Sequence, residues 1–230
     1  SDRIVLRSAG ERLGDMVVPP GFVGIGTICS ITLNGIFLKE GIPVSNRFGG
    51  IVSIFRNEPE GFVSLISYEG SSVAPLEIFM KSKMTDVLGT LRRGTGKILG
   101  SFREIPEASL VQAKKIDQKL KTLGFSGVIL FGRPSQPLLG IPVTTGKVGM
   151  VVLGGLNPIA ALEEARISSE SKAMASLISY HEMHPIGTYR LSGMERRWPL
   201  PQLFEHLLGR KGHLDHDYWS IFEPLKQSTL

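Results

Sequence analysis

The chain repeats two short words of its own sequence, and an internal repeat constrains the possible folds more than any single motif does. The word Gly-Ile-Pro-Val occupies residues 41–44 and again 140–143. The word Ser-Leu-Ile-Ser-Tyr occupies residues 64–68 and again 176–180. Two identical short words can arise by chance, so a duplication needs a further match in the same order.

A third, looser match supplies that order. Residues 21–25 lead into a turn rich in Gly, Ser and Thr and then into an apolar, helix-like run. Residues 146–150 lead into a glycine-rich turn at 154–158 and another such run. This match and Ser-Leu-Ile-Ser-Tyr follow one another in the same order in both places, so we interpret them as two related halves.

We therefore predict one domain over residues 1–230, because a chain of this length can bury a substantial core by itself. The halves cover about residues 16–80 and 140–190. An insert covers 81–139, and a tail covers 191–230.

The local pattern of the second half is strand, turn and helix. The apolar run at 148–153 suits a buried strand. Asn157 is a residue type that caps helices, and Pro158 fits the first turn of a helix because its missing N–H costs nothing there. Good helix formers follow at 159–165.

The sequence of the first half indicates the same order of strand, turn and helix. Ser30 or Thr32 can cap a helix through residues 36–38, and Gly41 can end it in the left-handed conformation. Residues 48–55 then predict a strand with a glycine bulge.

The insert predicts a strand, a helix and a second strand. The strands are expected at 97–102 and 127–131, and the helix should begin at Pro106 and end at Gly124. The expected fold class is therefore α/β or α+β, with internally duplicated strand–turn–helix halves and a strand–helix–strand insert. The tail suggests a short helix at 201–208.

Composition limits where the protein acts and what it binds. No stretch approaches the roughly 18 apolar residues of a membrane helix, so we expect no membrane partner. The only cysteine, Cys29, excludes an intramolecular disulfide and fits a reducing cytosol, which predicts a cytoplasmic protein. The net charge of +5 comes from scattered Lys and Arg, a pattern that favours ordinary solvated surface charge over a nucleic-acid surface and is also compatible with binding a small dianion.

No catalytic or metal-binding arrangement stands out. Cys29 lies near a predicted helix start but has no evident base beside it in the sequence. His181 and His184, like His213 and His216, have the spacing of a helical metal pair, but no cysteine joins either pair. We therefore predict no catalytic residue, no metal and no cofactor, and we expect the protein not to be an enzyme.

The two glycine-rich turns each place small residues and free N–H groups at a predicted helix N-terminus. Such a place attracts anions through the unsatisfied donors and the helix dipole. The same turns also suit a tight strand-to-helix connection that binds nothing. The residues alone leave both interpretations open.

Six segments, taken in order, resemble the regulatory domain of the archaeal nitrogen-regulation repressor family NrpR: 24–30, 33–35, 41–44, 102–106, 132–143 and 154–158. The resemblance implies a domain that dimerises and senses 2-oxoglutarate, which relieves repression of nitrogen-assimilation genes. In the family a winged-helix module binds operator DNA. Such a module is absent from this sequence, so operator DNA would be a partner only through it.

A dicarboxylate effector would bind near both turns and would need a cation, since charged bidentate hydrogen bonds are strong. The expected effector-binding residues are Thr27, Cys29, Ser30 and Asn34 at the first turn, Gly154, Gly155 and Asn157 at the second, and Arg47, Arg103 and Arg133 as candidate cations. Two alternatives remain: an enzyme acting on a small carboxylate at the same glycine-rich site, and a ligand-free dimerisation scaffold.

Overall fold

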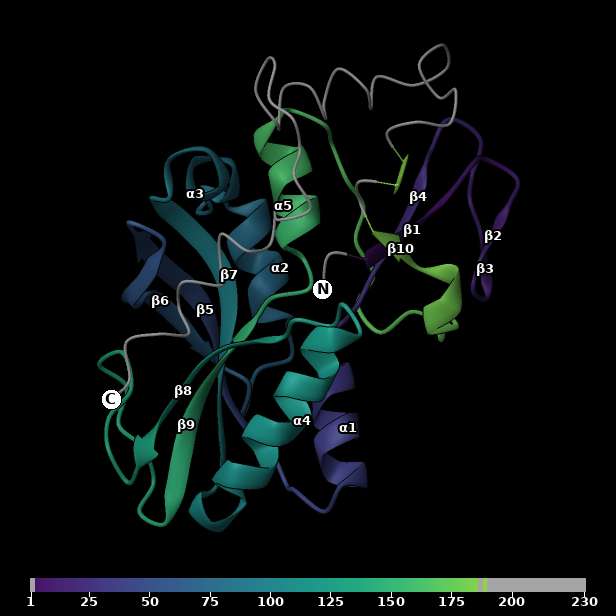
Figure 1. Cartoon of the computed structure of the whole chain (residues 1–230). Coiled ribbons are helices and arrows are strands. Elements are labelled where there is room, and N and C mark those ends of the chain that lie inside the picture. The colour runs from purple at the N-terminus through teal and green to yellow at the C-terminus, as the bar shows by residue number, and fades with distance from the viewer. Residues whose placement is uncertain (1–2, 186–187, 190–230) are drawn as a thin grey trace.

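The computed structural model describes residues 3–185 and 188–189, and its largest element is a five-stranded sheet (Figure 1). The strand order is β6-β5-β7-β9-β8, and every neighbouring pair is antiparallel. The strands are β5 (Ser45–Phe55), β6 (Glu58–Ser67), β7 (Gly96–Pro106), β8 (Val128–Pro134) and β9 (Lys147–Leu153). An antiparallel sheet combined with helices makes the fold α+β, one of the two expected classes.

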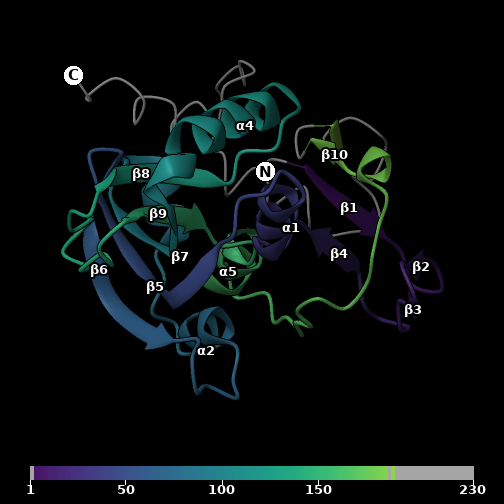
Figure 2. The same cartoon turned by 90° about the horizontal axis from the view of Figure 1, so that it is seen from below.

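Five α-helices are found in the described part of the chain. They are α1 (Ile31–Lys39), α2 (Pro75–Lys81), α3 (Val87–Arg93), α4 (Leu110–Thr122) and α5 (Asn157–Glu164). Figure 2 shows α4, α1, α5 and α2 along one side of the curved sheet. None of the helices in these residues is long and apolar enough to span a bilayer.

A second, smaller sheet lies beside the first one. It has the antiparallel order β10-β1-β4, formed by β1 (Arg3–Arg7), β4 (Gly24–Thr27) and β10 (His184–Pro185). A short hairpin of β2 (Arg12–Leu13) and β3 (Met16–Val17) extends from it. Because β4 leads directly into α1, the chain passes here from the small sheet to the helices that cover the large one.

Two apolar clusters hold the helices on the sheet. In the cluster under α1 and α4, Leu33 and Phe37 are at most 1% exposed and pack with Met150 of β9. The other cluster joins α2, α3 and α5 to β5 and β7 through residues such as Phe79 and Leu99. Each fully buried side chain of this kind contributes about 1.5–3 kcal/mol, so the clusters fix where α1 and α5 begin.

The repeated words occupy partly equivalent places. Gly41 and Gly140 both have φ of +79°, and each word leads into a strand that pairs antiparallel with β7. The other word falls in strand β6 at 64–67 but in irregular chain and a 3₁₀ turn at 176–180. The strand–turn–helix order occurs twice, as β4–α1 and β9–α5, although β4 and β9 belong to different sheets.

The predicted helix ends are confirmed. Gly41 follows the last residue of α1 and its C-cap Glu40, and Gly124 follows α4 with φ of +75°. The start predicted at Pro106 is shifted, since a 3₁₀ turn at Glu107–Ser109 precedes α4. The predicted helix at 201–208 lies outside the described residues.

The predicted glycine bulge in β5 is wrong in position. The register shifts of β5 lie between Asn46 and Phe48 and beyond Ile51, not at the glycines. A Cβ atom on Gly50 would lie 2.4 Å from the carbonyl oxygen of Ser64, so this glycine allows close strand packing instead.

Candidate functional site

Residues 28–30 form the first turn, between β4 and α1. Ser30 has helical backbone angles (φ −61°, ψ −17°), and its side chain makes no cap hydrogen bond. An N-cap side chain reaches the helix N–H groups from an extended backbone, so the predicted Ser30 cap is wrong. Thr32 lies inside α1 and does not cap it either. The Ser30 hydroxyl instead accepts a hydrogen bond from Nη2 of Arg103 at 2.7 Å.

Residues 154–156 form the second turn, between β9 and α5. The predicted Asn157 cap is also wrong, because Asn157 is already the first residue of α5 and points at β7. Its Oδ1 accepts the N–H of Leu99 at 2.8 Å, and its Nδ2 donates to the carbonyl oxygens of Leu99 at 2.8 Å and Gly154 at 2.9 Å. This buried amide fixes the start of α5 to the large sheet.

The two turns touch each other. A Cβ atom on Gly155 would lie 2.4 Å from the carbonyl oxygen of Ile28 and 3.3 Å from Cα of Cys29. One on Gly154 would lie 2.9 Å from both Cβ and the carbonyl oxygen of Leu99. Glycine at these two positions is therefore explained by the packing of one turn on the other and on β7.

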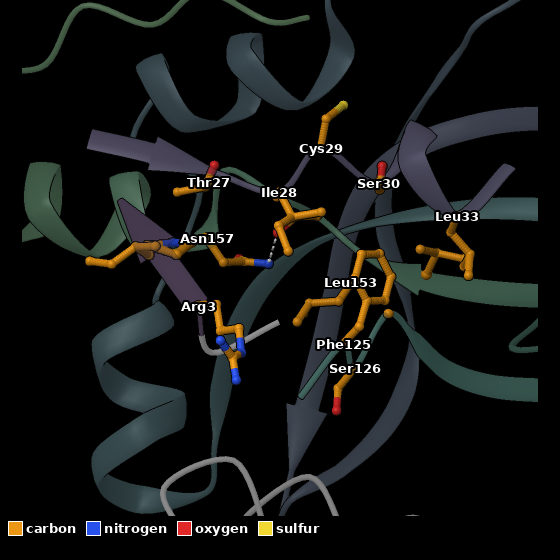
Figure 3. A pocket seen from close by; sticks show the side chains of 16 residues that line it. Arg3, Thr27, Ile28, Cys29, Ser30, Leu33, Phe125, Ser126, Leu153 and Asn157 are labelled. Atoms are coloured by element: carbon orange, nitrogen blue, oxygen red, sulfur yellow. Dashed lines mark hydrogen bonds between the residues drawn. The ribbon is translucent and has the colours of Figure 1, made fainter. Parts of the chain in front are cut away.

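A small pocket, partly open to solvent, lies where the turns meet (Figure 3). Six of the ten predicted effector-binding residues line it: Thr27, Cys29, Ser30, Gly154, Gly155 and Asn157. The fold thus brings both turns to one pocket. Figure 3 shows the Cys29 thiol and the Ser30 hydroxyl pointing away from Phe125 and Leu153 on the opposite wall.

The sequence interpretation missed the remaining walls of the pocket. Arg3 and Ile4 come from β1, and Phe125 and Ser126 precede β8. Nη1 of Arg3 donates to the carbonyl oxygen of Met183 at 2.9 Å, and its guanidinium lies 5.1 Å from the ring centre of Tyr180. Arg3 and Ile4 carry no motif, and the pairing of β1 with β4 brings them to the pocket.

Arg103 contacts the first turn from the side of β7 but does not line the pocket. It lies on β7 and is 2% exposed. Nη1 donates to the carbonyl oxygen of Ser30 at 2.9 Å and to Oδ1 of Asn34, and Nε donates to Oγ of Ser101 at 3.2 Å. Burial lowers the pKa of Arg103 to about 10, so the guanidinium is still charged at neutral pH. Asn34 is thus a support for Arg103 and likewise lies outside the pocket lining.

The other two predicted cations are not brought to the pocket. Nη1 of Arg47 pairs with Oε1 of Glu104 at 2.7 Å, so its charge is neutralised there. Arg133 is exposed near the end of β8, six residues beyond Gly127 of the pocket wall. Six residues of strand span about 20 Å, which is too far for contact.

The junction of the two turns carries positive charge that, among the described residues, no acidic side chain of the pocket lining balances. Among the residues that the structure describes, no Asp or Glu lines the pocket. Neither α1 nor α5 has an acidic residue in its first turn. Two positive helix ends therefore meet at the pocket, with Arg3 on one wall and Arg103 behind the first turn, and no carboxylate of the described residues is part of the lining.

Helix α3 shows how the same molecule neutralises a helix start elsewhere. The side chain of Asp86 accepts the N–H of Gly89 at 3.0 Å. The carboxylate of Glu164 accepts the N–H groups of Val87 and Leu88, both at 2.8 Å. The start of α3 is thus neutralised by two carboxylates, whereas α1 and α5 have no acidic residue in their first turns.

The first histidine pair has the spacing of a helical metal pair but does not lie on a helix. His181 lies in a 3₁₀ turn and His184 in β10, so they share no helical face. In residues 3–185 and 188–189, no group of three or more His, Cys, Asp or Glu is placed to hold a metal ion. His213 and His216 lie outside the described residues.

A family profile described as "NrpR regulatory domains NRD1 and 2" matches residues 1–185 of the sequence. The chain belongs to the NrpR regulatory-domain family. The relatives include the global nitrogen regulator NrpRI of Methanosarcina mazei, 43% identical over 172 residues that make up 75% of this chain and 53% of that protein. The global nitrogen regulator NrpR of Methanococcus maripaludis is 29% identical over 93% of this chain and 40% of its own length. The chain thus spans about half the length, or less, of these NrpR relatives.

The fold agrees with a solved structure from the same group. The crystal structure of a nitrogen repressor-like protein from Methanococcus jannaschii superposes with a TM-score of 0.65 at 30% identity, covering 80% of this chain and 74% of that one. The resemblance to NrpR inferred from short ordered words is confirmed by these matches over the whole regulatory domain.

Proposed function

We propose that this chain is the effector-sensing and dimerisation domain of a repressor of nitrogen-assimilation genes, and that 2-oxoglutarate bound at the two turns relieves repression. The observation that carries the proposal is the pocket at the junction of α1 and α5, where two helix N-termini meet, Arg3 lines one wall and, among the described residues, no acidic side chain is part of the lining. Uncompensated positive charge of this kind favours an anion.

A dicarboxylate suits the junction better than a larger anion. The pocket is small and its lining is mostly apolar, with Phe125 and Leu153 opposite the turns, so a short carbon chain can lie against them while a carboxylate faces the turns. Membership of the NrpR family supports the choice of 2-oxoglutarate, since relatives carry the name of nitrogen regulators.

Binding would act on DNA through another part of the repressor. The pocket is walled by β1 of the small sheet and by residues next to β8 and β9 of the large sheet. An effector in it contacts both sheets and therefore favours one arrangement of them over another, which is the differential affinity that allosteric release requires. A dimer would carry this change to the attached winged-helix modules.

Isothermal titration of the 230-residue chain with 2-oxoglutarate is the direct test. We expect saturable heat, and a weaker response to glutarate, which lacks the keto group. The same samples in an analytical ultracentrifuge should sediment as dimers. Absence of heat at millimolar 2-oxoglutarate, with dimers still present, would favour the ligand-free scaffold.

The enzyme alternative has a separate readout. A sensor leaves its effector intact, so the NMR spectrum of 2-oxoglutarate incubated with the protein should not change over hours. Consumption of the ligand in proportion to protein concentration would contradict the proposal and support catalysis on a small carboxylate.

A further inference from the structure

The polar side of the first turn does not face the pocket interior. The Cys29 thiol and the Ser30 hydroxyl project away from Phe125 and Leu153 (Figure 3), and the Ser30 hydroxyl meets Arg103. The polar atoms expected to hold an effector thus point toward β7 and the end of β6. That region contains a group of residues that sequence reasoning did not connect with the turn.

Tyr68, one residue after β6, completes this group. Its hydroxyl would lie 2.9 Å from a Cβ atom on Gly49, so the absence of a side chain there makes room for it. Ser101, which accepts a hydrogen bond from Nε of Arg103, also interacts with the Tyr68 hydroxyl. Tyr68 and Cys29 are half-buried, and they form the solvent side of the cluster above the buried Arg103.

The guanidinium of Arg103 has a donor left over. A guanidinium carries five N–H groups. Nε uses one for Ser101, Nη1 uses two for Ser30 and Asn34, and Nη2 uses one for the Ser30 hydroxyl, which leaves one on Nη2. All of these partners are neutral, and no carboxylate pairs with Arg103 among the residues that the structure describes.

A buried cation without a counter-charge is costly, and most buried charges in proteins are paired. Tyr68 lies close enough to Arg103 for the two groups to interact electrostatically, and burial raises the pKa of Tyr68, which keeps its hydroxyl protonated as a donor. Nη2 of Arg103 and the hydroxyl of Tyr68 therefore offer two hydrogen-bond donors, one of them charged, with no acceptor of opposite charge.

We infer that Arg103 and Tyr68 bind one carboxylate of a small organic acid, on the side of the first turn that faces β7. The inference rests on the proposed function in taking that acid to be the dicarboxylate effector. It assigns a role to Tyr68 and selects Arg103 from the three candidate cations.

The test measures 2-oxoglutarate binding by titration calorimetry for the wild-type chain, Tyr68→Phe and Arg103→Lys. Tyr68→Phe keeps the ring and removes only the donor, so it should fold, and its thermal transition verifies this. Loss of a hydrogen bond to a charged group weakens binding by roughly 10- to 100-fold, and we expect that range for both variants. Arg133→Gln, on the exposed end of β8, is the matched control and should bind as the wild type does.

A second readout separates contact from a structural role. A bound carboxylate disfavours the tyrosinate anion, so saturating 2-oxoglutarate should move one tyrosine titration, followed by absorbance at alkaline pH, to higher pH. The shift should be missing in Tyr68→Phe. Unchanged affinity in both variants, or weakened binding in Arg3→Gln but not in Tyr68→Phe, would overturn the inference and leave the proposed function standing.

Failure of the wild type to bind 2-oxoglutarate would refute the proposed function instead. The carboxylate site is then judged with acetate as the probe. A rise of the Tyr68 titration with acetate would support a carboxylate site for another acid, and an unmoved titration would overturn that site as well.

Discussion

The side-chain amide of Asn157 pairs with both main-chain groups of Leu99, accepting its N–H at 2.8 Å and donating to its carbonyl oxygen at 2.8 Å. Strand β9 ends at Leu153, opposite Gly100, and beyond that point its main chain keeps one hydrogen bond to β7, from the N–H of Gly154 to the carbonyl oxygen of Leu99 at 2.9 Å. The N–H of Leu99 bonds to the Asn157 amide, where a continuing strand would offer a main-chain carbonyl. The second turn of the pocket is therefore held by the sheet rather than by a helix cap.

Replacing Asn157 with Ala should destabilise the fold by about 2–4 kcal/mol, because the buried N–H of Leu99 loses its partner. Urea unfolding followed by circular dichroism measures the change. Asn46→Ala, which removes an exposed amide that bonds to Asn34, should cost less than 1 kcal/mol. Equal losses in the two variants would argue against the strand-like role of Asn157.

Replacing Gly155 with Ala should cost about 1–3 kcal/mol, because the new Cβ collides with the carbonyl oxygen of Ile28. Gly35 offers the matched control, since it lies in exposed helix with nothing within 4 Å of an added Cβ. Gly35→Ala should raise stability by about 0.5–1 kcal/mol. The midpoint of thermal unfolding should thus fall for Gly155→Ala and rise for Gly35→Ala. An unchanged midpoint for Gly155→Ala would mean that the turns can separate freely.

The buried Glu104 should make stability depend on pH. Burial alone would raise its pKa, but hydrogen bonds from Thr144 and the charge of Arg47 outweigh burial and lower it. A lowered folded-state pKa gives stability that is present above the unfolded value of about 4.3 and is lost as the pH falls through the folded value. Glu104→Gln should therefore be less stable than the wild type at pH 7, and the gap should narrow toward pH 3. A gap that stays constant over this range would contradict the assignment.

The only cysteine of the chain reports on ligand binding at the first turn without a mutation. Cys29 is half-buried at the first turn, so a bound effector should shield its thiol from iodoacetamide. Mass spectrometry of the labelled chain should show a slower reaction with 2-oxoglutarate than without it. Protein unfolded in urea gives the unshielded rate for comparison. The same rate with and without 2-oxoglutarate in the folded protein would place the effector away from this turn.

Local signals in the sequence were sufficient for the ends of α1 and α4 and for the strands of the insert, since Gly41 and Gly124 act through their own backbone angles. They were not sufficient for the roles of Asn157 and Ser30. Both residue types cap helices when the backbone is extended, and only the fold decides that Asn157 bonds to β7 and Ser30 to Arg103.

The choice among the three arginines also needed the fold. Adjacent strand residues point to opposite faces, so Arg103 and Glu104 diverge. The side chain of Arg103 points toward α1, while that of Glu104 points to the other face of the sheet, where it pairs with Arg47. The alternation of side chains along a strand predicts that Arg103 and Glu104 lie on opposite faces of the sheet. It does not predict which of them faces the helix. Arg3 lies more than twenty residues before the first turn, and no local pattern links it to that turn.

The contact of Gly155 with Ile28 has a mechanical consequence. It is a backbone-to-backbone contact between two connections that begin in different sheets. Side chains can relieve a close contact by changing rotamer. Two main-chain segments in contact cannot, so they can move only by rotating against each other. The contact can therefore act as a pivot point between the two sheets. If the small sheet rocks against the large one, we expect the rotation to be centred on this contact, so that a small movement beside the pocket becomes a larger one at the hairpin of β2 and β3.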